Sequence, residues 1–130
     1  TGSAYTDYIE QFHLNHESVD VRLAAITYLS EVEQAPAETF IALLGDDDKY
    51  VQGASVNALF NSSEQAGVQH GLELALNPDT NDFVRLEVLN QLDQNSELRQ
   101  TYSHQINEIA SVTESEEIKN IIDSILSKNG

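Results

Sequence analysis

The chain has 130 residues and no cysteine, and its 22 acidic and 6 basic side chains give a net charge of −16. This length corresponds to one domain, and the missing cysteines exclude a disulfide framework, a thiolate nucleophile and a cysteine-based zinc site. We expect a soluble protein that does not bind nucleic acid or anionic lipid, because both interactions require lysine and arginine to displace counterions.

The two ends and the hydropathy set further expectations. Residues 1–3, Thr-Gly-Ser, look like a remnant of cloning, and we expect a single domain over 4–130 that was cut from a longer protein. No apolar run approaches the roughly 20 residues of a membrane-spanning helix, so membrane insertion is not expected. The cytoplasm is slightly favoured as the compartment, and a soluble periplasmic fragment is the alternative.

Apolar residues recur along the chain at i, i+3 and i+4 spacing, which predicts amphipathic helices and no strand. Four of these helices share a pattern that starts from an anchor residue: Val21, Val51, Val84 and Ile118. The residues four and eight positions after each anchor lie on the same helix face: Ala25 and Leu29, Ser55 and Leu59, Val88 and Leu92, Ile122 and Leu126. A stripe that returns every 30 to 34 residues is typical of stacked helical repeats.

A further helical pattern precedes each anchored helix, so the predicted unit is a pair of helices. The apolar sets of these first helices are Tyr5, Tyr8, Ile9 and Phe12; Phe40, Leu43 and Leu44; Val68, Leu72, Ala75 and Leu76; and Leu98, Tyr102, Ile106 and Ile109. We expect four pairs, at about 4–33, 34–62, 63–95 and 96–130. One pair cannot bury its apolar face alone, which explains why the unit is copied.

Several joints between these helices carry residues that start or stop a helix. Asn77-Pro78 is expected to end one helix, with Asp79 or Thr80 as the N-cap of the next. The acidic run 46–48 suits a helix start, where negative charge is favourable. Two capping boxes are predicted, Ser62 with Gln65 and Thr113 with Glu116.

Gly67, Gly71 and Ala75 form a stripe of small residues on the first helix of the third pair. Glycine inside a helix costs about 1 kcal/mol relative to alanine, so we expect a neighbouring helix to approach closely there.

The anchored helices also resemble a known family. An acidic turn followed by Val-Arg-x-x-Ala-x-x-x-Leu resembles the second helix of HEAT-like repeats, particularly the short phycobilisome-lyase type that also occurs in bacterial regulators. The segment DVRLAAITYL matches best, DFVRLEVLNQL nearly as well, KYVQGASVNAL has Gln52 in place of arginine, and EEIKNIIDSIL matches loosely. The resemblance implies an all-α, right-handed α-solenoid of about four antiparallel helix pairs, with the second helices on the inner surface.

Helix geometry indicates which residues of the second helices point outward. A turn of about 100° per residue from Val21 places Ala25, Leu29 and Val32 inward, and Leu23 and Thr27 outward. The residues that we expect to bind a partner occupy equivalent outward positions: Leu23, Thr27, Gly53, Asn57, Phe60, Leu86, Asn90 and Asp93. With Ser124 of the fourth repeat, Thr27, Asn57 and Asn90 form a predicted ladder of small polar groups. The alternative interpretation is an ordinary solvated helix face.

The residue after each anchor is long and polar, namely Arg22, Gln52, Arg85 and Lys119. We expect these side chains to be structural, because arginine forms bidentate pairs with turn carboxylates. The carboxylates available in the turns are Asp20, Asp47, Asp48, Asp79 and Asp82. Three cations among 22 acids do not make an anion site.

No pattern favours catalysis, a cofactor or a metal. His13, His16 and Glu17 form the sequence HLNHE, which lacks the spacing of a zincin motif and the three or four ligands of a zinc site. We therefore expect a non-catalytic module that binds a protein or peptide partner, which could be basic because the chain is acidic. The alternatives are a regulatory or sensory domain of a larger bacterial signalling protein, similar to anti-sigma factors, and a ligand-handling protein similar to bilin lyases.

Overall fold

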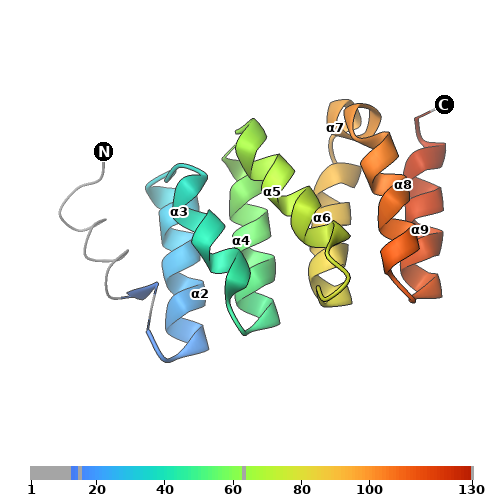
Figure 1. Cartoon of the computed structure of the whole chain (residues 1–130). Coiled ribbons are helices and arrows are strands. Elements are labelled where there is room, and N and C mark those ends of the chain that lie inside the picture. Colours follow the sequence, from blue (N-terminus) through green and yellow to red (C-terminus); the bar gives the residue numbers. More distant parts are fainter. Residues whose placement is uncertain (1–12, 15, 63, 130) are drawn as a thin grey trace. The chain divides into compact units, whose positions relative to one another are not determined.

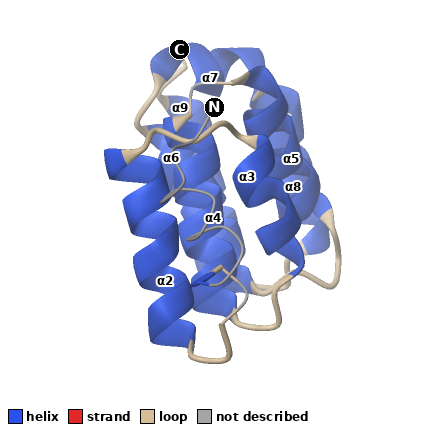
Figure 2. Ribbon diagram, turned by 90° about the vertical axis from the view of Figure 1, so that its left-hand side faces the viewer, coloured by secondary structure: helices blue, strands red, loops and turns tan. Residues whose placement is uncertain are grey.

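The computed structural model describes residues 13–129 with the exception of residues 15 and 63. These residues form eight α-helices, one π-helical turn and one 3-10 segment, and no strand occurs among them (Figure 1, Figure 2). The prediction of an all-α chain is confirmed. The first predicted helical pattern, from Tyr5 to Phe12, lies outside the described residues, as do residues 1–3.

The chain divides into two compact units, Thr1–Gln69 and His70–Gly130, and the boundary falls inside one helix. The first unit contains α2 (Val19–Thr27), the π-helical turn η2 (Tyr28–Val32), α3 (Glu38–Ile41), the 3-10 segment η3 (Ala42–Gly45), α4 (Lys49–Asn61) and the first residues of α5 (Gln65–Leu76). Helix α4 packs against α2, α3 and η3 (Figure 1). The largest fully buried side chains of this unit are Ile26, Leu29, Phe40, Val51, Val56 and Leu59.

The second unit contains the end of α5, α6 (Asp82–Asp93), α7 (Ser96–Thr101), α8 (Ser103–Val112) and α9 (Glu116–Ser127). Helix α9 packs against α6 and α8, and α7 packs against the same two helices. Its largest fully buried side chains are Leu89, Leu92, Ile106, Ile109, Ile118 and Ile122. Each unit therefore has an apolar core of its own.

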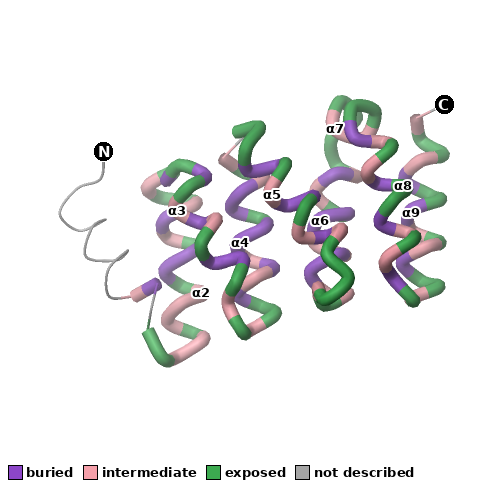
Figure 3. Tube along the Cα trace, in the orientation of Figure 1, coloured by how far each residue is buried: buried purple, intermediate pink, exposed green. Residues whose placement is uncertain are grey.

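The repeated stripe is buried as the sequence predicts. The anchors Val51, Val84 and Ile118 are at most 1% exposed, and Val21 is half-buried. Figure 3 shows buried positions along α2, α4, α6 and α9, the helices that carry the stripe. The positions four and eight residues later are buried in every helix except at Leu126, which is half-buried. Ser55 is the one polar member of the stripe, and its Oγ donates to the carbonyl of Val51 at 2.7 Å. A hydroxyl in the core is tolerated because this bond satisfies it.

The prediction that Val32 faces inward is wrong, because its side chain is 64% exposed. The cause is η2, where the Glu33 N–H donates to the Tyr28 carbonyl five residues back, at 3.2 Å. A π-helical turn holds more residues than an α-helical turn, so Val32 rotates off the buried face.

The first helix of the fourth pair is also different from its prediction. Leu98, Tyr102, Ile106 and Ile109 were expected on one helix, but the chain breaks at Tyr102, where φ is −108° and ψ is 22°. Helices α7 and α8 meet there. Tyr102, Ile106 and Ile109 are nevertheless buried, as the spacing of apolar residues predicts.

The predicted cap of α4 is right, and the predicted caps of α6 and α9 are wrong. Asp48 caps α4, because its Oδ1 accepts from the N–H groups of Tyr50 at 2.8 Å and Val51 at 3.1 Å. The N-cap of α6 is Asn81 rather than Asp79 or Thr80, and the N-cap of α9 is Ser115 rather than Thr113. An N-cap must immediately precede the first helical residue, and both loops extend further than the sequence pattern suggested.

Neither predicted capping box forms. Ser62 donates its hydroxyl to the carbonyl of Leu59 at 2.6 Å, and its Oγ accepts the N–H of Glu64 at 3.4 Å, between the end of α4 and the start of α5. Thr113 instead donates to Asp82 Oδ1 at 3.0 Å and accepts from the Ser115 N–H at 3.1 Å. Both hydroxyls are therefore used by loops that hold helix ends together.

The close approach predicted at the small-residue stripe is present at Gly67. A Cβ built on Gly67 would lie 2.9 Å from the carbonyl oxygen of Leu59 and 3.4 Å from Cβ of Ala37. Helix α5 thus begins in contact with the backbone of α4, which leaves no room for a side chain.

Candidate partner-binding surface

In α2, α4 and α6, the residue after the anchor holds the chain that precedes the helix. Gln52 Nε2 donates to the carbonyl of Leu44 at 2.7 Å, at the end of η3. Arg85 Nε donates to the carbonyl of Ala75 at 3.0 Å, and Arg85 Nη2 to that of Asn77 at 2.7 Å. The last carbonyls of a helix have no partner within the helix, so these side chains satisfy them.

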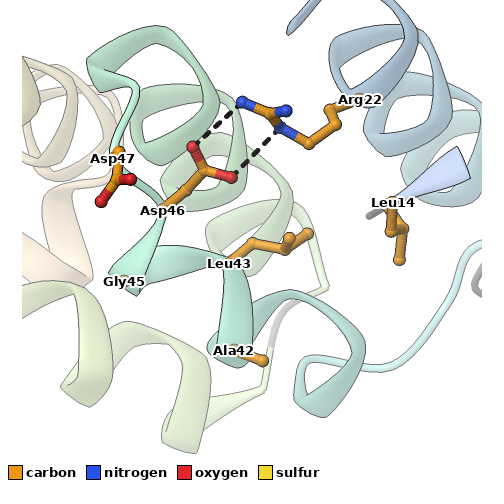
Figure 4. Close-up of a pocket in the computed structure, with 7 residues that line it drawn as sticks. All are labelled: Leu14, Arg22, Ala42, Leu43, Gly45, Asp46 and Asp47. Atoms are coloured by element: carbon orange, nitrogen blue, oxygen red, sulfur yellow. Dashed lines mark hydrogen bonds and ion pairs between the residues drawn. The ribbon is translucent and has the colours of Figure 1, made fainter. Parts of the chain in front are cut away.

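The predicted pairing of Arg85 with a turn carboxylate is confirmed, because its Nη1 lies 2.7 Å from Asp82 Oδ1. Arg22 pairs with Asp46, a carboxylate that we did not single out for it, and the distance from Nε to Oδ2 is 3.2 Å (Figure 4). Among the described residues, Lys119 pairs with Glu116 on its own helix, at 3.6 Å.

Arg22 also donates from Nη1 to the carbonyls of His16 at 2.6 Å and Glu17 at 3.1 Å. The pair with Asp46 lies on the wall of a pocket of about 350 Å³ in the first unit. Figure 4 shows the residues that line this pocket: Leu14, Arg22, Ala42, Leu43, Gly45, Asp46 and Asp47. The guanidinium is engaged by a carboxylate and two carbonyls, so the pocket is a poor anion site.

The predicted binding residues of the first unit lie on α2 and α4, which pack against each other. Thr27 and Asn57 are exposed, and Leu23 and Phe60 are half-buried. The Asn57 side chain is oriented by its own helix, since Asn61 Nδ2 donates to Asn57 Oδ1 at 2.8 Å. This arrangement leaves the amide group of Asn57 at the surface with its Oδ1 directed towards the C-terminal end of α4.

The outward position predicted for Gly53 is wrong, because Gly53 is buried. Helix α4 packs against α2, α3 and η3, so more of its circumference is covered than the sequence pattern suggested. Gly53 cannot contact a partner in this structure and leaves the candidate set.

The predicted residues of the second unit all lie on α6. Asn90 is exposed and Leu86 is half-buried, and Ser124 on the neighbouring α9 is exposed. Asp93 has an intramolecular partner, because its Oδ1 lies 2.6 Å from Nζ of Lys128. Asp93 therefore joins α6 to the end of α9.

The most exposed large apolar side chains of the described residues are not the predicted ones. They are Val32, 64% exposed, and Tyr50, 52% exposed. They lie near opposite ends of their segments, with Val32 at the end of η2 and Tyr50 at the start of α4. Lys49 Nζ lies 5.3 Å from the centroid of the Tyr50 ring, a cation–π arrangement that covers part of that ring.

A second pocket of the first unit has a volume of about 610 Å³. It lies where η2 and α4 end, and its lining is Ser30, Gln34, Ala35, Pro36, Ala58, Asn61, Ser62 and Glu64. Asn61 connects it to the candidate surface, since this side chain is bonded to Asn57. The sequence pattern did not reveal this pocket, because it is formed by a loop and two helix ends rather than by a helix face.

His13, His16 and Glu17 of HLNHE belong to no cluster of three potential metal ligands among the described residues. His16 Nδ1 accepts the N–H of Ser18 at 3.0 Å, at the start of α2. Within residues 13–129 other than 15 and 63, no three histidine, aspartate or glutamate side chains are grouped as metal ligands. No helix in the same part of the chain has the length and hydropathy needed to cross a membrane.

Comparison with known proteins returns no family model, no curated protein and no solved structure that matches this chain. The resemblance to HEAT-like repeats stays a prediction.

Proposed function

We propose that this chain is a non-catalytic HEAT-like repeat module, a right-handed solenoid of antiparallel helix pairs, that binds a protein or peptide partner on its second helices. The observation that carries the proposal is on α2 and α4, where the exposed Thr27 and Asn57 accompany the half-buried Leu23 and Phe60. Such a mixture suits a contact surface, since apolar groups gain from further burial and polar groups fix the partner's register.

Phe60 is the expected anchor of this surface. It is the largest side chain of the candidate set, and aromatic residues contribute most per contact when a partner covers them. The hydroxyl of Thr27 and the amide of Asn57 are small groups suited to the backbone of an extended segment or a partner helix. The excess of acidic side chains favours a partner with basic residues.

The proposal is tested by immobilising the chain and measuring partner capture from extracts of its source cells. We expect Phe60→Ala to reduce capture of a defined partner by at least about tenfold, the effect typical of an interface hot spot. Asn57→Ala is expected to have a smaller effect in the same direction.

Two variants serve as matched controls. Tyr50→Ala removes an exposed aromatic side chain from the other end of α4, and Gln69→Ala removes an exposed amide from α5. Both should capture the partner as the parent chain does. If the controls abolish capture while Phe60→Ala and Asn57→Ala retain it, the binding surface lies elsewhere.

A further inference from the structure

The pocket of about 610 Å³ in the first unit has the chemistry of a cation site. Four side chains that can accept hydrogen bonds line it, Ser30, Gln34, Asn61 and Ser62, together with the carboxylate of Glu64. No basic residue is in this lining. A ligand with several N–H donors and a positive charge would match it.

The carboxylate of Glu64 is held in place by the protein. Its Oε2 accepts the N–H of Ala37, just before α3, at 2.7 Å. A carboxylate can accept about four hydrogen bonds, so one backbone donor leaves most of its capacity for a ligand. Glu64 is therefore an oriented negative group at the wall of the pocket.

Two helical segments end at this pocket. The last carbonyls of a helix carry partial negative charge, which a basic side chain in the final turn often offsets. Neither η2 nor α4 has a basic residue in its last turn. No lysine or arginine occurs anywhere between Lys49 and Arg85, or between Arg22 and Lys49. The protein thus leaves the negative potential at these two ends uncompensated.

The backbone conformation of Gln34 is an independent indication that the pocket binds a ligand. It has a φ of 51°, in the left-handed region, and the next N–H, that of Ala35, closes the helix end on the Leu29 carbonyl at 2.9 Å. Glycine is the residue usually found at this position, because a side chain costs energy there. The chain instead places a long amide side chain on the wall of the pocket.

From these observations we propose that the pocket binds the positively charged side chain of an arginine or lysine presented by the protein partner. Glu64 pairs with the charge, and the amides of Gln34 and Asn61 accept the remaining N–H groups. Because Asn61 is bonded to Asn57, the pocket continues the candidate surface of α2 and α4. The inference rests on the proposed function. It adds that the partner carries a basic residue next to the segment that contacts Phe60.

The test uses three blocked tripeptides, acetyl-Ala-Arg-Ala-amide, its lysine analogue and its neutral citrulline analogue. Each is titrated into the isotopically labelled full chain while amide chemical shifts are recorded. We expect the arginine and lysine peptides to shift the signals of Gln34, Ala35, Asn61 and Ser62. The citrulline peptide should bind at least about fivefold more weakly, because it lacks the charge.

Two variants separate binding from stability. Glu64→Gln keeps an acceptor for the Ala37 N–H but removes the charge. It should lower the affinity for the arginine peptide about fivefold. Its control is Glu17→Gln, an exposed carboxylate before α2, which should leave the affinity unchanged. Gln34→Gly should raise the melting temperature of the chain, because glycine adopts the left-handed conformation without strain. It should still weaken binding of the arginine peptide, because it removes an amide that contacts the peptide.

The inference is overturned if all three peptides bind equally, if Glu64→Gln and Glu17→Gln behave alike, or if calcium chloride shifts the same signals while the peptides do not. These outcomes do not decide the proposed function. If the peptides do not bind the pocket but Phe60→Ala still reduces partner capture, the pocket proposal is rejected and the proposed function is not.

Discussion

Arg85 Nη1 lies 2.7 Å from Asp82 Oδ1, and the arginine side chain is almost fully buried while the aspartate is 45% exposed. The same guanidinium donates to the carbonyls of Ala75 and Asn77. One side chain therefore fastens the end of α5 to the start of α6. The carboxylate that neutralises it also accepts the hydroxyl of Thr113 from the loop before α9.

Arg85→Ala should lower the free energy of unfolding by about 3 kcal/mol, because it removes the side-chain donor of the Ala75 carbonyl and one of the two donors that the Asn77 carbonyl and the Asp82 carboxylate each have. Urea denaturation followed by circular dichroism measures this change. Lys119→Ala removes a cation at the equivalent position of α9, where the pair with Glu116 is exposed, and should cost less than about 0.5 kcal/mol. Similar losses for the two variants would contradict the role given to Arg85.

The sequence predicted Arg85 as a structural residue but not its principal contacts. A carboxylate three residues earlier is visible as a pattern, whereas a carbonyl acceptor has no sequence signature. The useful signal was the recurrence of a long polar donor after each anchor, Arg22, Gln52 and Arg85. Gln52 cannot pair with a carboxylate as arginine does, and its bond to the Leu44 carbonyl shows that the contact shared by these residues is with the backbone.

Thr113→Val should destabilise the chain by about 1 to 3 kcal/mol, because the isosteric valine at this buried position cannot accept the Ser115 N–H or donate to Asp82. Thermal unfolding of the variant, compared with Thr113→Ser, checks this. Serine keeps the hydroxyl and should recover most of the loss. Equal destabilisation by valine and serine would show that the methyl group, not the hydroxyl, is what matters at Thr113.

Gly67→Ala should destabilise the chain by about 1 to 3 kcal/mol despite the better helix propensity of alanine, since the new Cβ would lie 2.9 Å from the Leu59 carbonyl. The carbonyl belongs to the backbone of α4 and cannot rotate away as a side chain could. The midpoint of urea denaturation reports the effect.

Gly45→Ala is the matched control, because a Cβ there meets nothing within 4 Å. It should be neutral or stabilising by up to about 1 kcal/mol, through the reduced entropy of the unfolded chain. A stabilised Gly67→Ala variant would mean that α5 does not approach α4 as closely as described.

Asp48→Ala should cost about 1 to 2 kcal/mol, because two N–H groups at the start of α4 lose their acceptor. The adjacent Asp47→Ala removes the same charge from an exposed residue that is not the N-cap, and its effect should be within about 0.5 kcal/mol. The difference between the two melting temperatures isolates the cap from the charge. No difference would indicate that α4 gains nothing specific from Asp48.

The buried stripes were predictable because helix periodicity depends only on spacing along the chain. Val51, Val84 and Ile118 needed no knowledge of their neighbours. The outward face was less predictable. Gly53 is buried by elements that surround α4, and Val32 is exposed by a π-helical turn. Neither cause can be predicted from the spacing of apolar residues.

The pocket beside Glu64 was not predictable for a related reason. Its walls come from the ends of η2 and α4 and the loop before α3, and their meeting depends on a left-handed residue at Gln34. Glutamine carries no propensity for that conformation that a sequence pattern could reveal. Only the absence of basic residues near both helix ends was visible beforehand.

The most direct test of the proposed binding surface places a photo-crosslinking amino acid at Asn57 in source cells and compares it with the same amino acid at Gln69. We predict a discrete crosslinked partner from position 57 and none from position 69, with the yield at 57 strongly reduced by Phe60→Ala. Equal crosslinking at both positions, or a yield at 57 that Phe60→Ala leaves unchanged, would contradict the assignment of this surface.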